Sequence, residues 1–324
     1  MLWPCVLFLA GFVLLIKGGD WFVDGSVGVA RRFHLPEMLI GATIVSIGTT
    51  LPEVMVSSQA ALEHNAGISY GNAIGSIICN TSLIAAITLA IRPGRVNRKS
   101  MLLPAAFFFA AGISYAAIAW TAGSFQRWTG IMYLAVFAGY IILSAWQMKK
   151  HPEDAEEEQE EEDSRKKPFW QEILLLVIGA AAIAAGARLL VDNGTKIAAA
   201  LGVPDSVIGL TMVALGTSLP ELITAVTSLV KGHGALSLGN VIGANLFNIV
   251  LVSGAAITIS PFAIPAEKTI GGINSSLVID LPLMLLVMAV LCVPPLLLNG
   301  KTKRWQGILL LSVYAAFTVY QFVS

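Results

Sequence analysis

Long apolar runs, separated by short polar stretches, organise this chain. A helix needs about 20 residues to cross the roughly 30 Å hydrocarbon layer of a membrane. Runs of that length predict ten membrane-spanning helices, at 2–23, 38–62, 72–91, 101–121, 129–148, 170–191, 206–230, 238–260, 277–298 and 306–323. The first run has no basic residue before Lys17 and is long enough to span, so we interpret it as a helix rather than a signal peptide. The expected fold class is an all-α membrane protein.

Composition agrees with the pattern. The 324 residues are 56% hydrophobic and 12% charged, with a mean hydropathy of +0.77, whereas a soluble domain has about 25% charged residues. The net charge is zero and no nucleic-acid motif is present, so we expect no nucleic-acid partner. The three cysteines, Cys5, Cys79 and Cys292, fall in apolar runs without metal-ligand spacing.

Lysine and arginine indicate the orientation, because cytoplasmic loops collect them. With the N-terminus outside, 15 of the 20 basic residues lie in the loops that would then be cytoplasmic. The opposite loops hold only Arg127, Lys196 and Lys268. We therefore expect a multi-pass protein of the plasma (inner) membrane with both termini outside.

The acidic stretch "EDAEEEQEEED" at 153–163 divides the chain. It lies in a predicted cytoplasmic linker, 149–169, between a first five-span unit, 1–148, and a second, 170–324. A run of like charges is typical of a solvated linker. Because five spans is an odd number, the second unit would cross the membrane in the opposite direction.

An internal repeat supports two inverted units. Aligning 36–80 with 204–248, at a constant offset of 168 and without a gap, gives 16 identities in 45 positions. The identical residues of the first copy are Pro36, Ile40, Gly41, Thr43, Val45, Gly48, Thr49, Leu51, Pro52, Glu53, Ser69, Gly71, Asn72, Ile74, Gly75 and Asn80. Inverted repeats with interrupted helices at the midplane are the pattern of secondary transporters.

Each copy places a proline and a glutamate inside an apolar run. "GTTLPE" ends at Glu53 and "GTSLPE" at Glu221. A proline inside a helix removes a backbone hydrogen bond and clashes with the preceding turn, and a free carbonyl is costly in hydrocarbon unless it is satisfied. Thr49 and Thr50 lie four and three residues before Glu53, so their hydroxyls share its helix face.

The second half of each copy adds an amide-bearing segment. "GNAIGSIICN" (71–80) carries Asn72, Ser76 and Asn80 at steps of four, and "GNVIGANLFN" (239–248) carries Asn240, Ala244 and Asn248. Steps of four give one polar stripe on an apolar helix. Together with the glutamates, the stripes predict a pocket of oxygen ligands, which suits calcium with its six to eight oxygens. The four histidines all lie in loops or at span ends.

The paired "G-T-[ST]-L-P-E" and "G-N-x-[IV]-G-[SA]" segments resemble the α-repeats of the sodium/calcium exchanger family, within the wider calcium/cation antiporter group. The resemblance implies a ten-span prokaryotic type that exchanges calcium for sodium by alternating access. It implies no enzymatic activity and no cofactor, with calcium and sodium as the transported ions. Carried over to this sequence, it implies the ligands Thr49, Thr50, Glu53, Ser76, Asn80, Thr217, Ser218, Glu221 and Asn248.

Three positions depart from the family pattern. Members that resemble this chain have Asp where Asn248 stands, Ser where Ala244 stands, and commonly "GSN" where "GSI" occurs at 75–77. These departures imply a weaker peripheral sodium site and leave the sodium stoichiometry open.

Alternatives remain open at this point. The proton-coupled branch tends to carry a glutamate shortly after the Gly-Asn pair, where this chain has 73–75 and 241–243 without an acid. That favours sodium over calcium/proton exchange. A cation channel is a further alternative, although one occluded midplane site fits it less well. A membrane enzyme is disfavoured because no span carries "HExxH" or "GxSxG". Affinity, direction of transport and oligomeric state are not readable from the sequence.

Overall fold

The computed structural model describes residues 2–150, 168–201, 214–266 and 269–323. The helices and π-helical turns are α1 (Leu2–Arg32), α2 (Glu37–Ile40), η1 (Gly41–Val45), α3 (Ser46–Leu62), α4 (Ala66–Cys79), η2 (Asn80–Ala85), α5 (Ala86–Ile91), α6 (Arg98–Ala122), α7 (Arg127–Lys150), α8 (Phe169–Ala200), α10 (Ala214–Thr217), α11 (Leu219–Val230), α12 (Gly234–Phe247), η5 (Asn248–Ser253), α13 (Gly254–Ile259), η6 (Ser276–Asp280), α14 (Leu281–Leu297) and α15 (Arg304–Val323).

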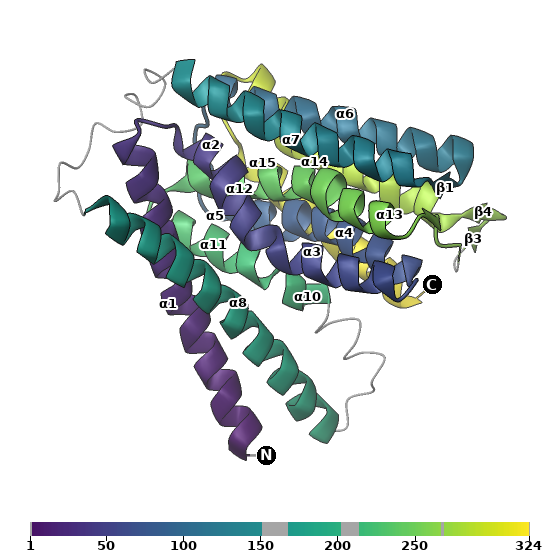
Figure 1. The fold of residues 1–324 in the computed structure, drawn as a ribbon, viewed down its shortest axis with the longest axis horizontal. Helices are drawn as coiled ribbons and strands as arrows, with labels where there is room; N and C mark the ends of the chain where they lie inside the picture. The colour runs from purple at the N-terminus through teal and green to yellow at the C-terminus, as the bar shows by residue number, and fades with distance from the viewer. Residues whose placement is uncertain (1, 151–167, 202–213, 267–268, 324) are drawn as a thin grey trace.

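The described strands are short and form two antiparallel pairs. Strand β1 (Ser124–Phe125) pairs with β2 (Phe262–Ala263), and β3 (Thr269–Ile270) pairs with β4 (Ile273–Asn274). These pairs connect helix ends at one end of the bundle (Figure 1). The protein is therefore predominantly helical, as expected.

Eight helical segments of the described chain are long and apolar enough to cross a membrane. They confirm eight of the ten predicted spans. The predicted span 206–230 lies partly outside the described residues, and its described part is helical as α10 and α11. The predicted span 306–323 is helical as α15 but is not among the eight.

Two predicted spans end too early. The first runs to Arg32 rather than residue 23, and the sixth runs to Ala200 rather than residue 191. Asp20 and Asp24 therefore lie within α1 instead of near its end. Both aspartates pair with Lys231, so their charges are compensated within the helix.

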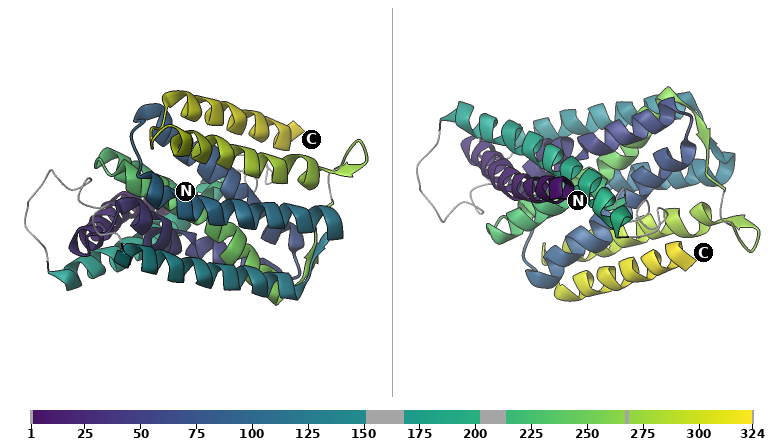
Figure 2. Two further views of the ribbon diagram at one scale, coloured as in Figure 1. Left: turned by 90° about the horizontal axis from the view of Figure 1, so that it is seen from above. Right: turned by 90° about the horizontal axis from the view of Figure 1, so that it is seen from below.

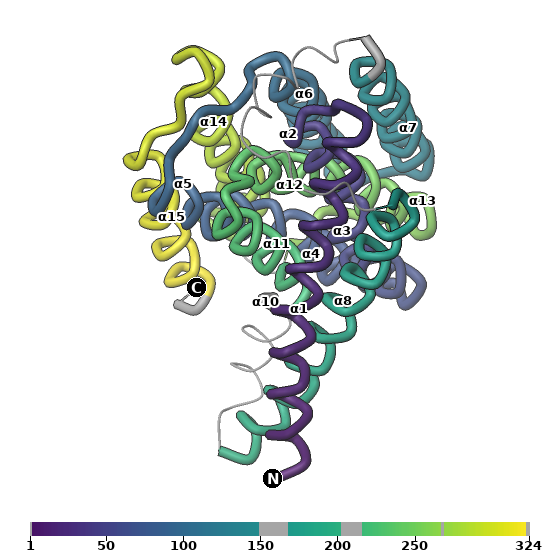
Figure 3. Tube along the Cα trace, turned by 90° about the vertical axis from the view of Figure 1, so that its left-hand side faces the viewer, coloured from purple at the N-terminus to yellow at the C-terminus, as the bar shows by residue number. Residues whose placement is uncertain are grey.

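Helices α1 and α8 lie side by side and extend beyond the other helices (Figures 1 and 3). Glycines allow the close approach: a Cβ added at Gly11 would lie 2.8 Å from the carbonyl oxygen of Gly186, and one at Gly18 would lie 2.8 Å from the amide nitrogen of Ile183. Small residues at such crossings are how membrane helices pack without a hydrophobic driving force.

The repeat segments form the buried centre of the molecule. Burial differs between the helical spans in the most apolar 18-residue window of each. In that window, 78% of the residues are buried for the span Gly234–Ile259 and 72% for Ala66–Ile91, but only 22% for α1 and for α8. The remaining long helices, α6, α7, α14 and α15, lie around this centre (Figure 2). Many large apolar side chains on the outer surface are exposed, including Trp120, Trp128 and Trp146, as a lipid-facing surface requires.

Candidate cation site

The two glutamates of the repeated motifs lie at the centre of the molecule. Glu53 on α3 and Glu221 on α11 are both fully buried, and the two helices contact each other. None of their four carboxylate oxygens has a hydrogen-bond partner within the described residues. Two charged carboxylates buried away from water are strongly unfavourable unless a cation or a proton neutralises them.

Four further predicted residues bring polar atoms to the same region. Thr50 and Ser218 are buried, and their hydroxyl oxygens have no partner among the described residues. Asn80 and Asn248 are fully buried, and neither the amide nitrogen nor the amide oxygen of either has a described partner. Buried polar groups are normally hydrogen-bonded. Their shared lack of partners therefore points to a ligand.

The two asparagines occupy equivalent positions in their copies. Each begins a π-helical turn, η2 at Asn80 and η5 at Asn248, and the two turns coincide at the offset of 168. A π-helical turn interrupts regular helix hydrogen bonding, and such turns are frequent at functional sites. The sequence predicted the two amides but carried no signal for the turns.

The side chain of Thr49, a predicted ligand, contacts the other copy of the repeat. Its hydroxyl donates to Oδ1 of Asn240 at 3.2 Å, and it also lies near the carboxylate of Glu221, in the other copy. Ser76 is buried and Thr217 is half-buried at the end of α10. The predicted ligands thus lie on α3, α4, η2, α10, α11 and η5, with Ser218 at the N-terminal cap of α11.

Sequence reasoning missed how Asn72 and Asn240 act. Nδ2 of Asn72 donates to the carbonyl oxygen of Glu53 at 3.2 Å and to the hydroxyl of Ser57 at 2.9 Å. Oδ1 of Asn240 instead accepts from Thr49 and from Ser46 across the two copies. Both asparagines support a glutamate helix rather than pointing free oxygens into the site. Both copies have Asn at this position when they are aligned at the offset of 168, and this identity was the sequence signal that could have indicated a shared role.

Close helix packing aligns the copies at the site. A Cβ at Gly41 would lie 2.5 Å from the carbonyl oxygen of Leu236, and one at Gly239 would clash with the carbonyl oxygen of Met38. One at Gly243 would clash with the hydroxyl of Ser46. Any side chain at these glycines would push α12 away from η1 and α3, and the Thr49–Asn240 hydrogen bond would break.

The free oxygens define the chemistry of the site. They are two from each glutamate, one hydroxyl each from Thr50 and Ser218, and one amide oxygen each from Asn80 and Asn248. Hard cations such as calcium take six to eight oxygen ligands. An oxygen-lined site with two carboxylates, at the centre of an apolar helical bundle, defines a membrane protein that carries cations.

Comparison with known proteins gives the family. The model for "sodium/calcium exchanger protein" matches residues 3–146 and 172–323, so the chain belongs to the sodium/calcium exchanger family. A membrane protein of Methanocaldococcus jannaschii is 38% identical over 95% of this chain and 94% of its own length. The sodium/calcium exchanger MaX1 of Methanosarcina acetivorans is 30% identical over 98% of both chains.

Solved structures share the fold. A structure of the sodium-calcium exchanger NCX_Mj, soaked with Na⁺ and Sr²⁺, has a TM-score of 0.79 at 33% identity and covers 98% of both chains. The family and this likeness identify the chain as an integral membrane protein of the cation antiporter class.

Proposed function

We propose that this protein exchanges calcium for sodium across the membrane by alternating access. Its ligands are Thr49, Thr50, Glu53, Ser76, Asn80, Thr217, Ser218, Glu221 and Asn248. The observation that carries the proposal is the pair of buried carboxylates, Glu53 and Glu221, with no described hydrogen-bond partner and with unsatisfied amide and hydroxyl oxygens around them. The names of the relatives support sodium and calcium as the ions.

Charge explains why one site serves both ions. With two carboxylates the empty site carries −2, so one calcium ion or two sodium ions neutralise it. A neutral loaded site crosses the low-dielectric interior at less cost than a charged one. Calcium and sodium therefore compete for the same oxygens, which is the requirement for obligatory exchange.

The proposed architecture has ten spans in two inverted five-helix units. The units are 1–148 and 170–324, joined by the acidic linker 149–169. The repeat at the offset of 168 supports it, as do the two matching π-helical turns. An inverted pair offers two conformations of similar energy, one open to each side.

The test of function is calcium uptake into sealed proteoliposomes that contain the purified protein. We expect saturable uptake that requires an outward sodium gradient and stops when choline replaces the sodium. Uptake driven by a proton gradient alone would instead assign calcium/proton exchange. Calcium flux without any counter-ion would assign a channel.

We further propose that both termini face outside and that residues 149–169 are cytoplasmic in the plasma (inner) membrane. The distribution of Lys and Arg supports this orientation. In a background without Cys5, Cys79 and Cys292, a cysteine at position 158 should react with an impermeant thiol reagent only after the cells are opened. Labelling of that cysteine in intact cells would reverse the orientation.

A further inference from the structure

Polar side chains continue along α11 past Glu221, toward the end that carries Lys231. Thr224 and Ser228 follow Glu221 by three and seven residues, so all three share one helix face. Both are fully buried, and neither hydroxyl oxygen has a hydrogen-bond partner within the described residues. A buried hydroxyl without a partner is unfavourable, so a polar ligand is expected beside them.

Hydroxyls elsewhere in the bundle are satisfied in another way. Ser26, Thr43 and Thr258 each donate to the carbonyl oxygen four residues earlier, at 2.7, 2.6 and 2.7 Å. That local bond is the ordinary solution for Ser and Thr inside a membrane helix. Thr224 and Ser228 do not make it, so their oxygens remain available as ligands.

More hydroxyls come from the elements that pack against α11. Ser82 on η2 is fully buried, and its oxygen also lacks a described partner. Thr88 on α5 and Ser237 on α12 are buried and hydrogen-bonded to each other at 3.3 Å. The elements that pack against α11 therefore carry further buried hydroxyls, of which that of Ser82 has no described partner.

The positions equivalent to these unpartnered hydroxyls are apolar, and the buried hydroxyl that follows Glu53 on α3, Ser57, has a partner in Asn72. At the offset of 168, Thr224 and Ser228 correspond to Val56 and Ala60, while Ser82 and Thr88 correspond to Val250 and Ala256. The shared fold therefore does not require these hydroxyls. They lie on one side of the carboxylate pair only.

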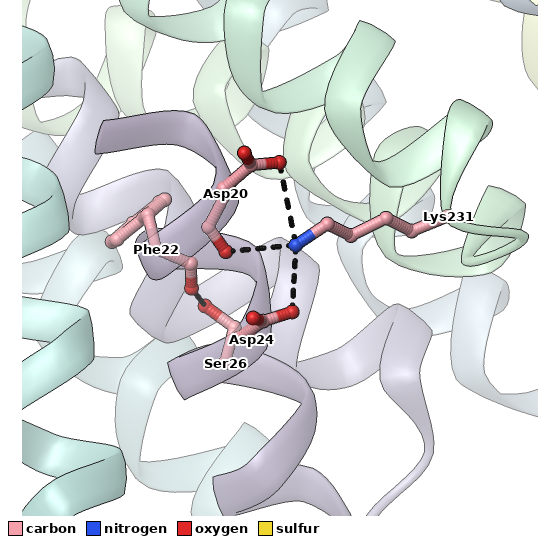
Figure 4. A network of polar contacts seen from close by, with 5 residues as sticks. All are labelled: Asp20, Phe22, Asp24, Ser26 and Lys231. Carbon is pink, nitrogen blue, oxygen red and sulfur yellow. Dashed lines mark hydrogen bonds and ion pairs between the residues drawn. The ribbon is translucent and has the colours of Figure 1, made fainter. Parts of the chain in front are cut away.

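The charges at the end of α11 do not oppose a cation there. Nζ of Lys231 lies 2.7 Å from Oδ1 of Asp24 and 3.4 Å from Oδ1 of Asp20, and it donates to the carbonyl oxygen of Asp20 at 3.1 Å (Figure 4). Two carboxylates around one ammonium give the group a formal charge of −1. The lysine is thus neutralised where it would otherwise repel an ion beside Ser228.

We propose that Thr224 and Ser228, which lie one and two helical turns beyond Glu221 on α11, form a second cation position for a monovalent hard ion, sodium, on the Lys231 side of the site. Neutral hydroxyls and water supply ligands, and the carboxylate of Glu221 supplies the charge. Calcium needs both carboxylates and stays between Glu53 and Glu221. The proposal rests on the proposed function, because it assumes that sodium is a transported ion.

The test is a sodium titration of thermal stability for the purified full-length protein, with choline holding the ionic strength constant. In the double variant Thr224→Val/Ser228→Ala, we expect the sodium concentration at half-maximal stabilisation to rise about tenfold. The reason is that the sodium ion loses two hydroxyl ligands. The corresponding calcium concentration should stay within about twofold, because the carboxylates remain. The matched control, Ser26→Ala/Thr258→Val, removes hydroxyls that have local partners and should change neither value.

Unchanged sodium stabilisation in the double variant would overturn the proposal. An equal loss for sodium and calcium would overturn it too, since that marks a structural role. If the double variant is not monodisperse, the single variants are titrated, and Thr224→Ser, which keeps the hydroxyl, should behave as wild type. A wild-type protein without any sodium response would refute sodium coupling itself, whereas a sodium response retained by the variants would refute only the second position.

Discussion

The two copies of the repeat carry the same types of predicted ligand except at Ser76, where the second copy has Ala244, but they are built differently around them. In the first copy, α3 continues through Pro52 without a break. In the second copy, the chain breaks at Ser218, and Pro220 lies in the first turn of α11. Proline is well tolerated at that position because its missing amide hydrogen would have no helical partner. The same motif thus gives an internal proline in one copy and a new helix start in the other.

The π-helical turns are also held differently. Thr81, which follows Asn80, accepts a hydrogen bond from Nδ2 of Asn245 at 2.7 Å, and Asn245 also contacts the sulfur of Met288. The positions that correspond to Asn245 and Thr81 are Ile77 and Ile249, both apolar. The second turn has instead the hydroxyl of Ser253, which donates to the carbonyl oxygen of Asn248 at 2.9 Å. The comparison teaches that the two copies repeat most of the predicted ligand positions but not the contacts that support them.

The largest expected effect tests what the copies share. Glu53→Gln and Glu221→Gln should each abolish sodium-driven calcium uptake, by at least about a hundredfold, because one carboxylate alone loses several kcal/mol of attraction for a divalent ion at an effective dielectric of about 20. Both variants should remain folded, since neither glutamate side chain has a hydrogen-bond partner within the described residues. Uptake is measured in proteoliposomes at equal protein content and monodispersity. Wild-type uptake by either variant would remove that glutamate from the site.

A smaller effect should separate the copies. Gly243→Ala places a Cβ against Ser46 and Ala42, whereas a Cβ at the corresponding Gly75 meets no described atom within 4 Å. We expect Gly243→Ala to lower the free energy of unfolding by about 1–3 kcal/mol, as overpacking does, and Gly75→Ala to change it by less than about 0.5 kcal/mol. The measurement is thermal unfolding in detergent without calcium or sodium. Equal losses would show that both glycines lie at close helix crossings.

The sequence predicted the spans and the polar residues better than it predicted their contacts. Apolar runs and the offset of 168 located eight helices and the glutamates, because hydrophobic length and repetition are local properties of the chain. The break at Ser218 and the Asn245–Thr81 contact depend on which helices pack together, so no local pattern indicated them. His233, which the sequence places at a span end, contacts Glu37 at 2.7 Å, and no local pattern indicated this contact either. The ligand set itself stays a prediction.

The smallest expected effect concerns the asparagines that occupy equivalent positions, Asn80 and Asn248. Asn248→Asp would bring a third carboxylate to the site, so the apparent calcium affinity should rise by about tenfold, with added pH sensitivity because the new acid can titrate there. Asn80→Asp is the matched variant in the other copy, and an equal gain is expected if the two amides are equivalent ligands. A gain in only one variant would show that the two copies bind the ion unequally.

The same variants address the number of sodium ions. A wild-type site of charge −2 is neutralised by two sodium ions, and a third would leave a positive charge in the membrane interior at a cost of a few kcal/mol. We therefore expect wild-type exchange to depend only weakly on voltage. We expect the Asn248→Asp variant to bind one additional sodium ion in each exchange cycle. The measurement is sodium-driven calcium flux in proteoliposomes with the membrane potential clamped by potassium and valinomycin. Steep voltage dependence of the wild type, together with high sodium affinity and a Hill coefficient of about three, would contradict the two-sodium mechanism.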